Sequence, residues 1–160
     1  MIFSFDKEHK VTSRFVQEEY FPAIVEFSSE ELNNHFIEFC YKDTDMLEFS
    51  VHPVTHTLKR FMLTLCNHYE IKDSSLDIPK CDEGTVSISG PDRLECEIFK
   101  AIVYRNGMNI LLSSEPADHY FRSGHIIFSF TKENIIAGII LTELSETEIT
   151  HIKSELEQAH

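Results

Sequence analysis

The stretch LEFSVHPVTHTLKRFMLTLC, residues 47–66, decides the fold of this chain. Its apolar residues alternate with polar ones on both sides of the HPVTHT segment: Leu47, Phe49 and Val51 before it, and Phe61, Leu63 and Leu65 after it. A period of two residues is typical of β-strands with one buried face. We therefore expect strands at residues 46–52 and 57–66, joined as a hairpin by HPVTHT.

The same stretch contains two histidines four residues apart, His52 and His56, which is a spacing that zinc-binding helices use. A zinc-binding HxxxH motif needs both histidines on one uninterrupted helix, together with a third ligand. Pro53 follows His52 directly, and proline is tolerated only in the first turn of a helix. The period-two flanks also favour strands, so a hairpin loop is the better interpretation and zinc is the alternative.

Further strands are expected along the second half of the chain. HIIFSF at 125–130 alternates, and IIAGIIL at 135–141 is apolar on both faces, as in a central strand that is covered on both sides. In EIFKAIVYRNGMNILLS, Asn106 and Gly107 separate two apolar runs. Both residue types tolerate positive φ, so this pair predicts a type I′ hairpin turn.

Two helices are expected, near residues 29–41 and at 145–157. Each begins with a capping box, formed by Ser28 with Glu31 and by Ser145 with Glu148. The apolar stripes follow at helical spacing: Leu32, Phe36, Phe39 and Cys40 in the first helix, and Ile149, Ile152 and Leu156 in the second.

The fold predicted for residues 1–160 is a single α+β domain, a mainly antiparallel multi-stranded sheet packed by these two helices. The chain has 160 residues with 42% hydrophobic and 26% charged content, which is ordinary for one globular core. Residues 72–84, KDSSLDIPKCDEG, combine turn formers and charges, and we expect a long surface connection there.

The charge of the chain excludes one class of partner. Lys and Arg number 14 against 27 Asp and Glu, which gives a formal net charge of −13, so direct binding of nucleic acid is not expected. The N-terminus lacks the pattern of a secretory signal and no apolar run reaches the length of a spanning helix, so we expect a cytoplasmic protein without membrane contact. The four cysteines form no CxxC pair, which favours buried, reduced thiols.

Motifs for catalysis or cofactor binding are absent from the sequence. There is no GxSxG, and the five glycines form no phosphate-binding loop. The best place left for a metal or an acid-base pair is DHYFRSGH, where His119 and His125 flank a predicted turn with Asp118 and Glu115 close by. Two polar loop histidines are the plainer interpretation, and we predict no catalytic residues, metal or cofactor.

The middle of the chain carries many acids on predicted loops and strand edges, where a basic partner could reach them. These residues, here called the acidic tract, are Asp73, Asp77, Asp82, Glu83, Asp92, Glu95 and Glu97. Paired acids elsewhere, such as Asp43 and Asp45, are expected to be solvated, as most such pairs are. A tight interface also needs an aromatic centre, for which Phe21, Tyr41, Tyr69, Tyr104 and Tyr120 are candidates, Tyr69 and Tyr104 above all.

Two segments resemble the small acidic immunity proteins that bacteria encode beside contact-dependent growth inhibition and other polymorphic toxins. One is LEFSVHPVTHTLKRFMLTLC, similar to their strand, His/Asp-Pro-x-Thr turn and strand. The other is HIIFSFTKENIIAGIILTELSETEITHI, residues 125–152, a strand, polar turn, apolar strand and acid-started helix. The likeness covers a little under a third of the chain.

This resemblance implies a protein without catalysis that binds a cognate toxin domain, often a basic nuclease, and occludes its active site. Two alternatives stay open from the residues alone. One is a small metal-dependent hydrolase built from His52, His56, His119, His125 and nearby acids. The other is an acidic adaptor that binds its partner by strand addition at an open sheet edge.

Overall fold

A computed structural model describes residues 1–8, 10–27 and 34–158. The elements in chain order are β1 (Ile2–Asp6), β2 (Arg14–Glu18), β3 (Phe21–Glu26), β4 (His35–Tyr41), β5 (Asp45–Val51), β6 (Leu58–Leu65), β7 (Tyr69–Ile71), β8 (Asp82–Glu83), β9 (Thr85–Ser89), β10 (Arg93–Glu95), β11 (Lys100–Val103), β12 (Met108–Leu111), β13 (His119–Ser123), β14 (Ile126–Phe130), β15 (Ile136–Leu141) and α1 (Glu146–Gln158). No helix in this described part of the chain is long and apolar enough to cross a membrane.

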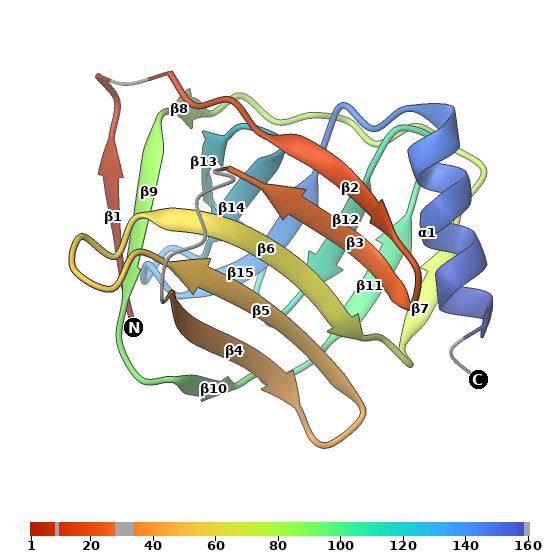
Figure 1. Ribbon diagram of the computed structural model, residues 1–160, viewed down its shortest axis with the longest axis horizontal. Coiled ribbons are helices and arrows are strands. Elements are labelled where there is room, and N and C mark those ends of the chain that lie inside the picture. The colour runs from red at the N-terminus through yellow and green to blue at the C-terminus, as the bar shows by residue number, and fades with distance from the viewer. Residues whose placement is uncertain (9, 28–33, 159–160) are drawn as a thin grey trace.

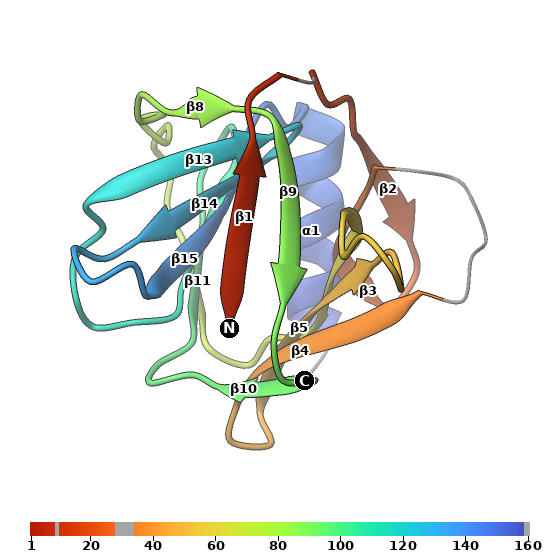
Figure 2. The same ribbon diagram turned by 90° about the vertical axis from the view of Figure 1, so that its left-hand side faces the viewer.

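The strands form two large sheets that lie face to face (Figure 1). Sheet B has the order β10-β4-β5-β6-β3-β2, and sheet C has the order β7-β11-β12-β15-β14-β13-β8. Helix α1 lies along one side of this sandwich, where it packs against β3 and β2. On the opposite side lies the two-stranded ribbon of β1 and β9 (Figure 2). The α+β class in one small domain is therefore confirmed.

Aromatic rings connect the two sheets across the core. Phe49 of sheet B lies with its ring centroid 5.5 Å from those of Phe39 and Phe61 and 5.6 Å from that of Phe128 in sheet C. Phe3 of β1 adds contacts to Phe128 at 5.7 Å. Because Phe49 is completely buried, truncating it to alanine would cost about 3–5 kcal/mol.

The central hairpin is confirmed as β5 and β6. Its loop is closed by the His52 amide, which donates to the Thr57 carbonyl at 2.9 Å, and by the His56 amide, which donates to the His52 carbonyl at 2.9 Å. His56 takes a positive φ of 61° in this turn. The two histidines are thus loop residues and share no helix.

The helix predicted near 29–41 is wrong where the structure describes it, because His35–Tyr41 is strand β4. The capping box of Ser28 and Glu31, and Leu32 of the stripe, lie outside the described residues. β4 pairs with β5 along its whole length. Ile37 and Phe39 are completely buried in the core, whereas Phe36, the residue before Ile37, is 53% exposed. Successive side chains that face opposite sides are typical of a strand.

The C-terminal helix is confirmed as α1. The Glu148 amide donates to Ser145 Oγ at 3.2 Å, and the Ser145 amide donates to Glu148 Oε1 at 2.9 Å, so the predicted capping box is complete. Ile149, Ile152 and Leu156 are its buried residues. The sheets differ from the prediction in number and direction: there are two large ones, and β10 with β4, β7 with β11 and β8 with β13 are parallel pairs among the antiparallel majority.

Asn106 and Gly107 do join two strands, β11 and β12, but neither has the positive φ of a type I′ turn. Gly107 is needed for close approach, since a Cβ there would lie 2.3 Å from the Leu141 carbonyl oxygen. Asn106 acts through its side chain: Oδ1 accepts from the Leu76 amide at 2.7 Å and Nδ2 donates to the Leu76 carbonyl at 3.1 Å.

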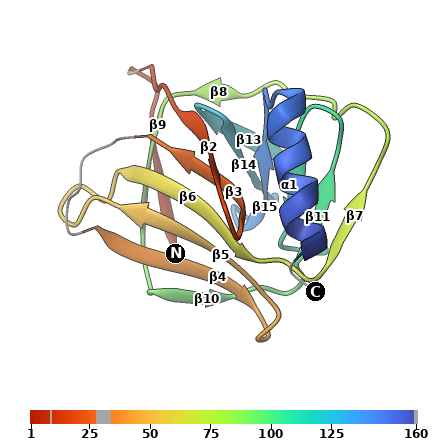
Figure 3. The same cartoon turned by 45° about the vertical axis from the view of Figure 1, so that its right-hand side comes forward.

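The other predicted strands are confirmed. The 125–130 segment contains β14, and 135–141 contains β15, which lies in the middle of sheet C and is buried at every residue. The expected connection at 72–84 leads from β7 at one edge of sheet C to β8 at the other edge (Figure 3). It ends in the short strand β8.

Candidate functional site

His52 and His56 have structural roles in the hairpin loop. His52 Nδ1 accepts the amides of Val54 and Thr55, each at 3.1 Å, so the ring closes the turn that Pro53 begins. His56 Nδ1 is buried without a hydrogen-bond partner. Across residues 1–8, 10–27 and 34–158, no three His, Cys, Asp or Glu side chains are grouped so that they could hold a metal ion.

His119 and His125 are separated by the length of β13. His119 begins the strand opposite Phe130, on whose ring it stacks at 5.5 Å, and its Nδ1 lies 3.3 Å from Asp118 Oδ2. His125 follows the strand and precedes β14. The structure therefore does not bring these two histidines together as one site.

His125 instead contacts Ser13, a residue that the sequence did not suggest. Ser13 Oγ accepts the backbone amide of His125 at 2.8 Å and lies 2.6 Å from its Nδ1. The Ser13 hydroxyl therefore contacts both the backbone and the ring of the residue that ends the β13–β14 turn. A Cβ on the neighbouring Gly124 would lie 2.3 Å from Ser13 Oγ. We interpret Ser13 as a cap that fastens the segment before β2 to the β13–β14 turn.

A polar cavity of about 370 Å³ opens beside this cap. Its charged wall is formed by Arg122, whose Nη2 lies 2.9 Å from Glu143 Oε2 and whose Nη1 lies 3.9 Å from Glu83 Oε1. The hydrogen bond from Arg122 holds the pKa of Glu143 below its ordinary value. The arginine is therefore already neutralised by acids of this chain.

The four cysteines are free, as predicted, with Cys40 and Cys66 buried and Cys81 and Cys96 half-buried. Burial raises the pKa of both Cys66 and Cys96 to about 12. These two thiols are protonated at neutral pH and are poor nucleophiles.

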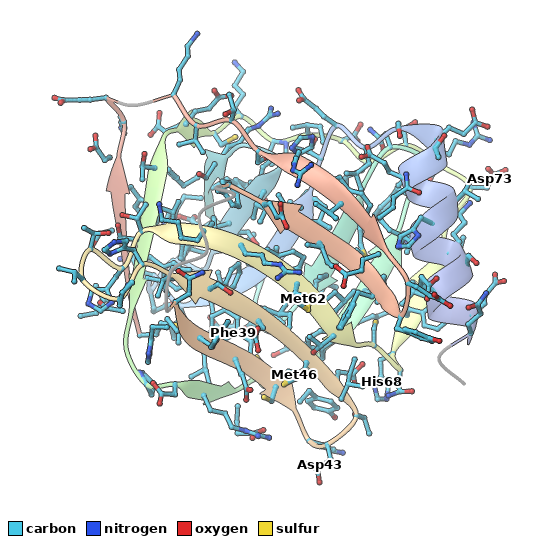
Figure 4. All side chains as sticks on the ribbon, viewed as in Figure 1. Phe39, Asp43, Met46, Met62, His68 and Asp73 are labelled. Carbon is cyan, nitrogen blue, oxygen red and sulfur yellow. The ribbon has the colours of Figure 1, made fainter. Side chains whose placement is uncertain are left out.

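All members of the acidic tract are exposed, but they follow the rim of the sandwich and do not form one patch. β8, with Asp82 and Glu83, lies at the opposite end of the molecule from β10, which carries Glu95 (Figure 1). Figure 4 shows Asp73 on a third side, beyond α1. Most of these acids have partners: Lys7 for Asp82, Arg105 for Asp73, His35 for Asp92, Arg93 for Glu95, Arg122 for Glu83, and Ser113 and Ser114 for Glu97.

The five candidate aromatic anchors, Phe21, Tyr41, Tyr69, Tyr104 and Tyr120, are all half-buried. Tyr69 lines a cavity of about 460 Å³ at the corner where the chain passes from sheet B to sheet C. The other lining residues are Asn67, His68, Ile98, Phe99 and Lys100.

A buried carboxylate supports this corner, contrary to the expectation that Asp45 is solvated. The Asp45 side chain has no exposed surface. Its oxygens accept from Thr44 Oγ1 at 2.7 Å, the Asn67 amide at 2.7 Å, the His68 amide at 3.0 Å and His68 Nδ1 at 2.6 Å. Asp45 and His68 are 23 residues apart, and no spacing in the sequence connects them. The His68 ring is half exposed, and its orientation is fixed from behind by Asp45.

A scan of protein-family models found none that matches the chain, and a search of curated proteins found no matching sequence. The geometry of this molecule is therefore the basis for any functional inference.

Proposed function

We propose that this protein is a non-enzymatic immunity protein. In this proposal it binds the cognate toxin domain of a contact-dependent growth inhibition system, a basic nuclease, and blocks its active site in the cytoplasm. The observation that carries the proposal is the charge distribution: a net charge of −13, with every member of the acidic tract exposed. Exposed acids of one sign accelerate the encounter with a basic partner.

The proposed contacts are the acidic tract together with Tyr69 and Tyr104. Carboxylates form charge-assisted hydrogen bonds with Arg and Lys side chains that a nuclease uses for phosphate groups. Because the existing ion pairs of the tract are exposed, each contributes about 0–1 kcal/mol and can be exchanged for a partner's cation. Half-buried tyrosines can supply apolar contact area within such a polar rim.

The experiment is co-expression with the protein encoded next to this one, followed by tandem purification and measurement of association rates at increasing salt. We expect a one-to-one complex whose toxin activity is abolished. The association rate should fall on the order of tenfold or more from low salt to high salt, because salt screens exposed charges. A neighbour that does not bind, or a complex that leaves the toxin active, would contradict the proposal.

A further inference from the structure

The outer face of sheet B is a second place where a partner could bind, distinct from the rim. Sheet B lies nearest the viewer in Figure 1, and none of the elements in residues 1–8, 10–27 and 34–158 covers it. Side chains directly opposite one another across the strands share this face. One row runs Arg93, Glu38, Glu48, Met62, Ile24, Val16, and the next runs Phe36, Ser50, Arg60, Glu26, Arg14.

Apolar surface is exposed on this face. Phe36 is 53% exposed, Met46 and Met62 are half-buried, and Leu65, opposite Met46, is 47% exposed. Figure 4 shows Met46 and Met62 on the strands nearest the viewer. Apolar residues that gather on an open sheet face within a polar rim are typical of an interaction surface.

The two rows of this face hold as many arginines as glutamates, and the place that favours a cationic partner is the pair Glu38 and Glu48. Glu38 and Glu48 are directly opposite each other on β4 and β5, an arrangement that is repulsive when both are charged. The arginines of the face are engaged: Arg14 with Glu26 at 2.8 Å, Arg60 with Glu18 at 3.7 Å, and Arg93 with Glu95 at 3.3 Å and Glu38 at 3.9 Å.

Glu48 makes no hydrogen bond or ion pair within the described chain, although Arg60 is close enough to lower its pKa in part. Burial, and secondly the charge of Glu38, raise the pKa of Glu48 above its ordinary value. A raised carboxylate pKa means that the folded state loses stability as pH rises through that pKa. The charged form of Glu48 is thus disfavoured in the free protein.

We propose that the outer face of β4, β5 and β6 is the docking surface for the basic partner. A Lys or Arg side chain of that partner lies between Glu38 and Glu48, and its apolar neighbours pack on Phe36, Met46 and Met62. This inference rests on the proposed function for the partner's identity, but it moves the centre of the interface from the rim to the sheet. The cation removes the repulsion between the two carboxylates and supplies Glu48 with its missing partner.

The substitution Glu48→Gln separates this role from a structural one. In the free protein we expect a rise of about 1–3 °C in Tm at pH 7, because a repulsive pair disappears. The rise should vanish at a pH low enough to protonate Glu48, where glutamate and glutamine are both neutral. The matched control is Glu26→Gln on the same face, which removes a carboxylate that is paired with Arg14 and should not raise Tm. A lower Tm for Glu48→Gln at pH 7 would overturn the proposal.

Binding is tested first with a defined probe, a hexa-arginine peptide titrated into the ¹⁵N-labelled full chain. We expect amide shifts in β4, β5 and β6, and about a tenfold loss of affinity in Glu48→Gln but not in Glu26→Gln. Shifts confined to the acidic tract, with Glu48→Gln binding as the wild type does, would overturn the docking surface.

The same variants are then measured against the co-purified toxin domain, with Glu48→Lys compared with Glu133→Lys. Both changes alter the net charge equally, but Glu133 lies in the turn between β14 and β15 of the other sheet. If Glu48→Lys weakens toxin binding and Glu133→Lys does not, the result supports the docking surface. If both variants bind the toxin equally well, the docking surface is rejected, although the toxin complex itself still forms. If the peptide shifts the amides of β4, β5 and β6 but no toxin binds, the docking surface is supported and the proposed function is contradicted.

Discussion

Asp45 is completely buried, yet its carboxylate is held by four donors from three residues. Asp45→Asn keeps the shape but replaces one acceptor oxygen with an NH₂ group, which faces the N–H or O–H donors already there. We expect a loss of roughly 2–4 kcal/mol in the free energy of unfolding, since buried donors would be left without an acceptor. Urea denaturation measures it. Asp43→Asn, in the exposed turn between β4 and β5, is the control and should change stability by less than about 0.5 kcal/mol.

The chemistry of single residues was the part least predictable from sequence. Asp45 follows a turn and precedes an alternating strand, which is a pattern that places acids in solvent. Its partners Asn67 and His68 follow the end of β6, so the pairing of β5 with β6 is needed to make the site. Ser13 and His125 are likewise 112 residues apart and meet through the tertiary fold.

The hairpin of β11 and β12 gives a prediction at the scale of an element. A type I′ turn would tolerate Asn106→Gly with little change in stability, because glycine also adopts positive φ. The structure instead predicts a loss of about 1–3 kcal/mol in the free energy of unfolding, because the two hydrogen bonds between the Asn106 side chain and the Leu76 backbone disappear. Thermal and urea unfolding decide between them. Gly107→Ala should also destabilise the fold, because its Cβ would lie 2.3 Å from the Leu141 carbonyl oxygen.

Elements with a strong local signal could be predicted, and those with two competing signals could not. The capping box and apolar stripe of α1 agree with each other, as do the two alternating halves of the β5–β6 hairpin. HFIEFCY at 35–41 has apolar residues on both faces, so a helical stripe and a strand both match it. The segment forms a strand because all seven of its residues pair with β5. The short parallel strands β7, β8 and β10 have two or three residues each, too few to show a period.

At the scale of the whole molecule, the dominant property is the excess of negative charge, which opposes compactness and weakens as pH falls toward the pI of about 5.0. A second effect acts at lower pH. The carboxyls of Glu143, Asp73, Glu70 and Glu97 have lowered pKa values, because of hydrogen bonds from Arg122, Arg105, Lys100 and Ser114 respectively. We therefore expect Tm to rise from pH 8 toward pH 5 and to fall again in more acidic buffer.

Glu143→Gln tests the acidic limb of that profile. A carboxyl whose folded pKa is depressed stabilises the protein fully above its unfolded pKa, near 4.5, and this contribution is lost as pH falls through the folded value. Glu143→Gln should therefore have a lower Tm than the wild type at pH 7, and the difference should shrink as pH falls below about 4.5. Glu133→Gln is the matched control, because Glu133 is exposed and has no ion pair within the described residues, and its difference should stay near zero at every pH. A Glu143→Gln difference that is constant with pH would mean that the pair of Glu143 with Arg122 does not contribute to the acid sensitivity of the fold.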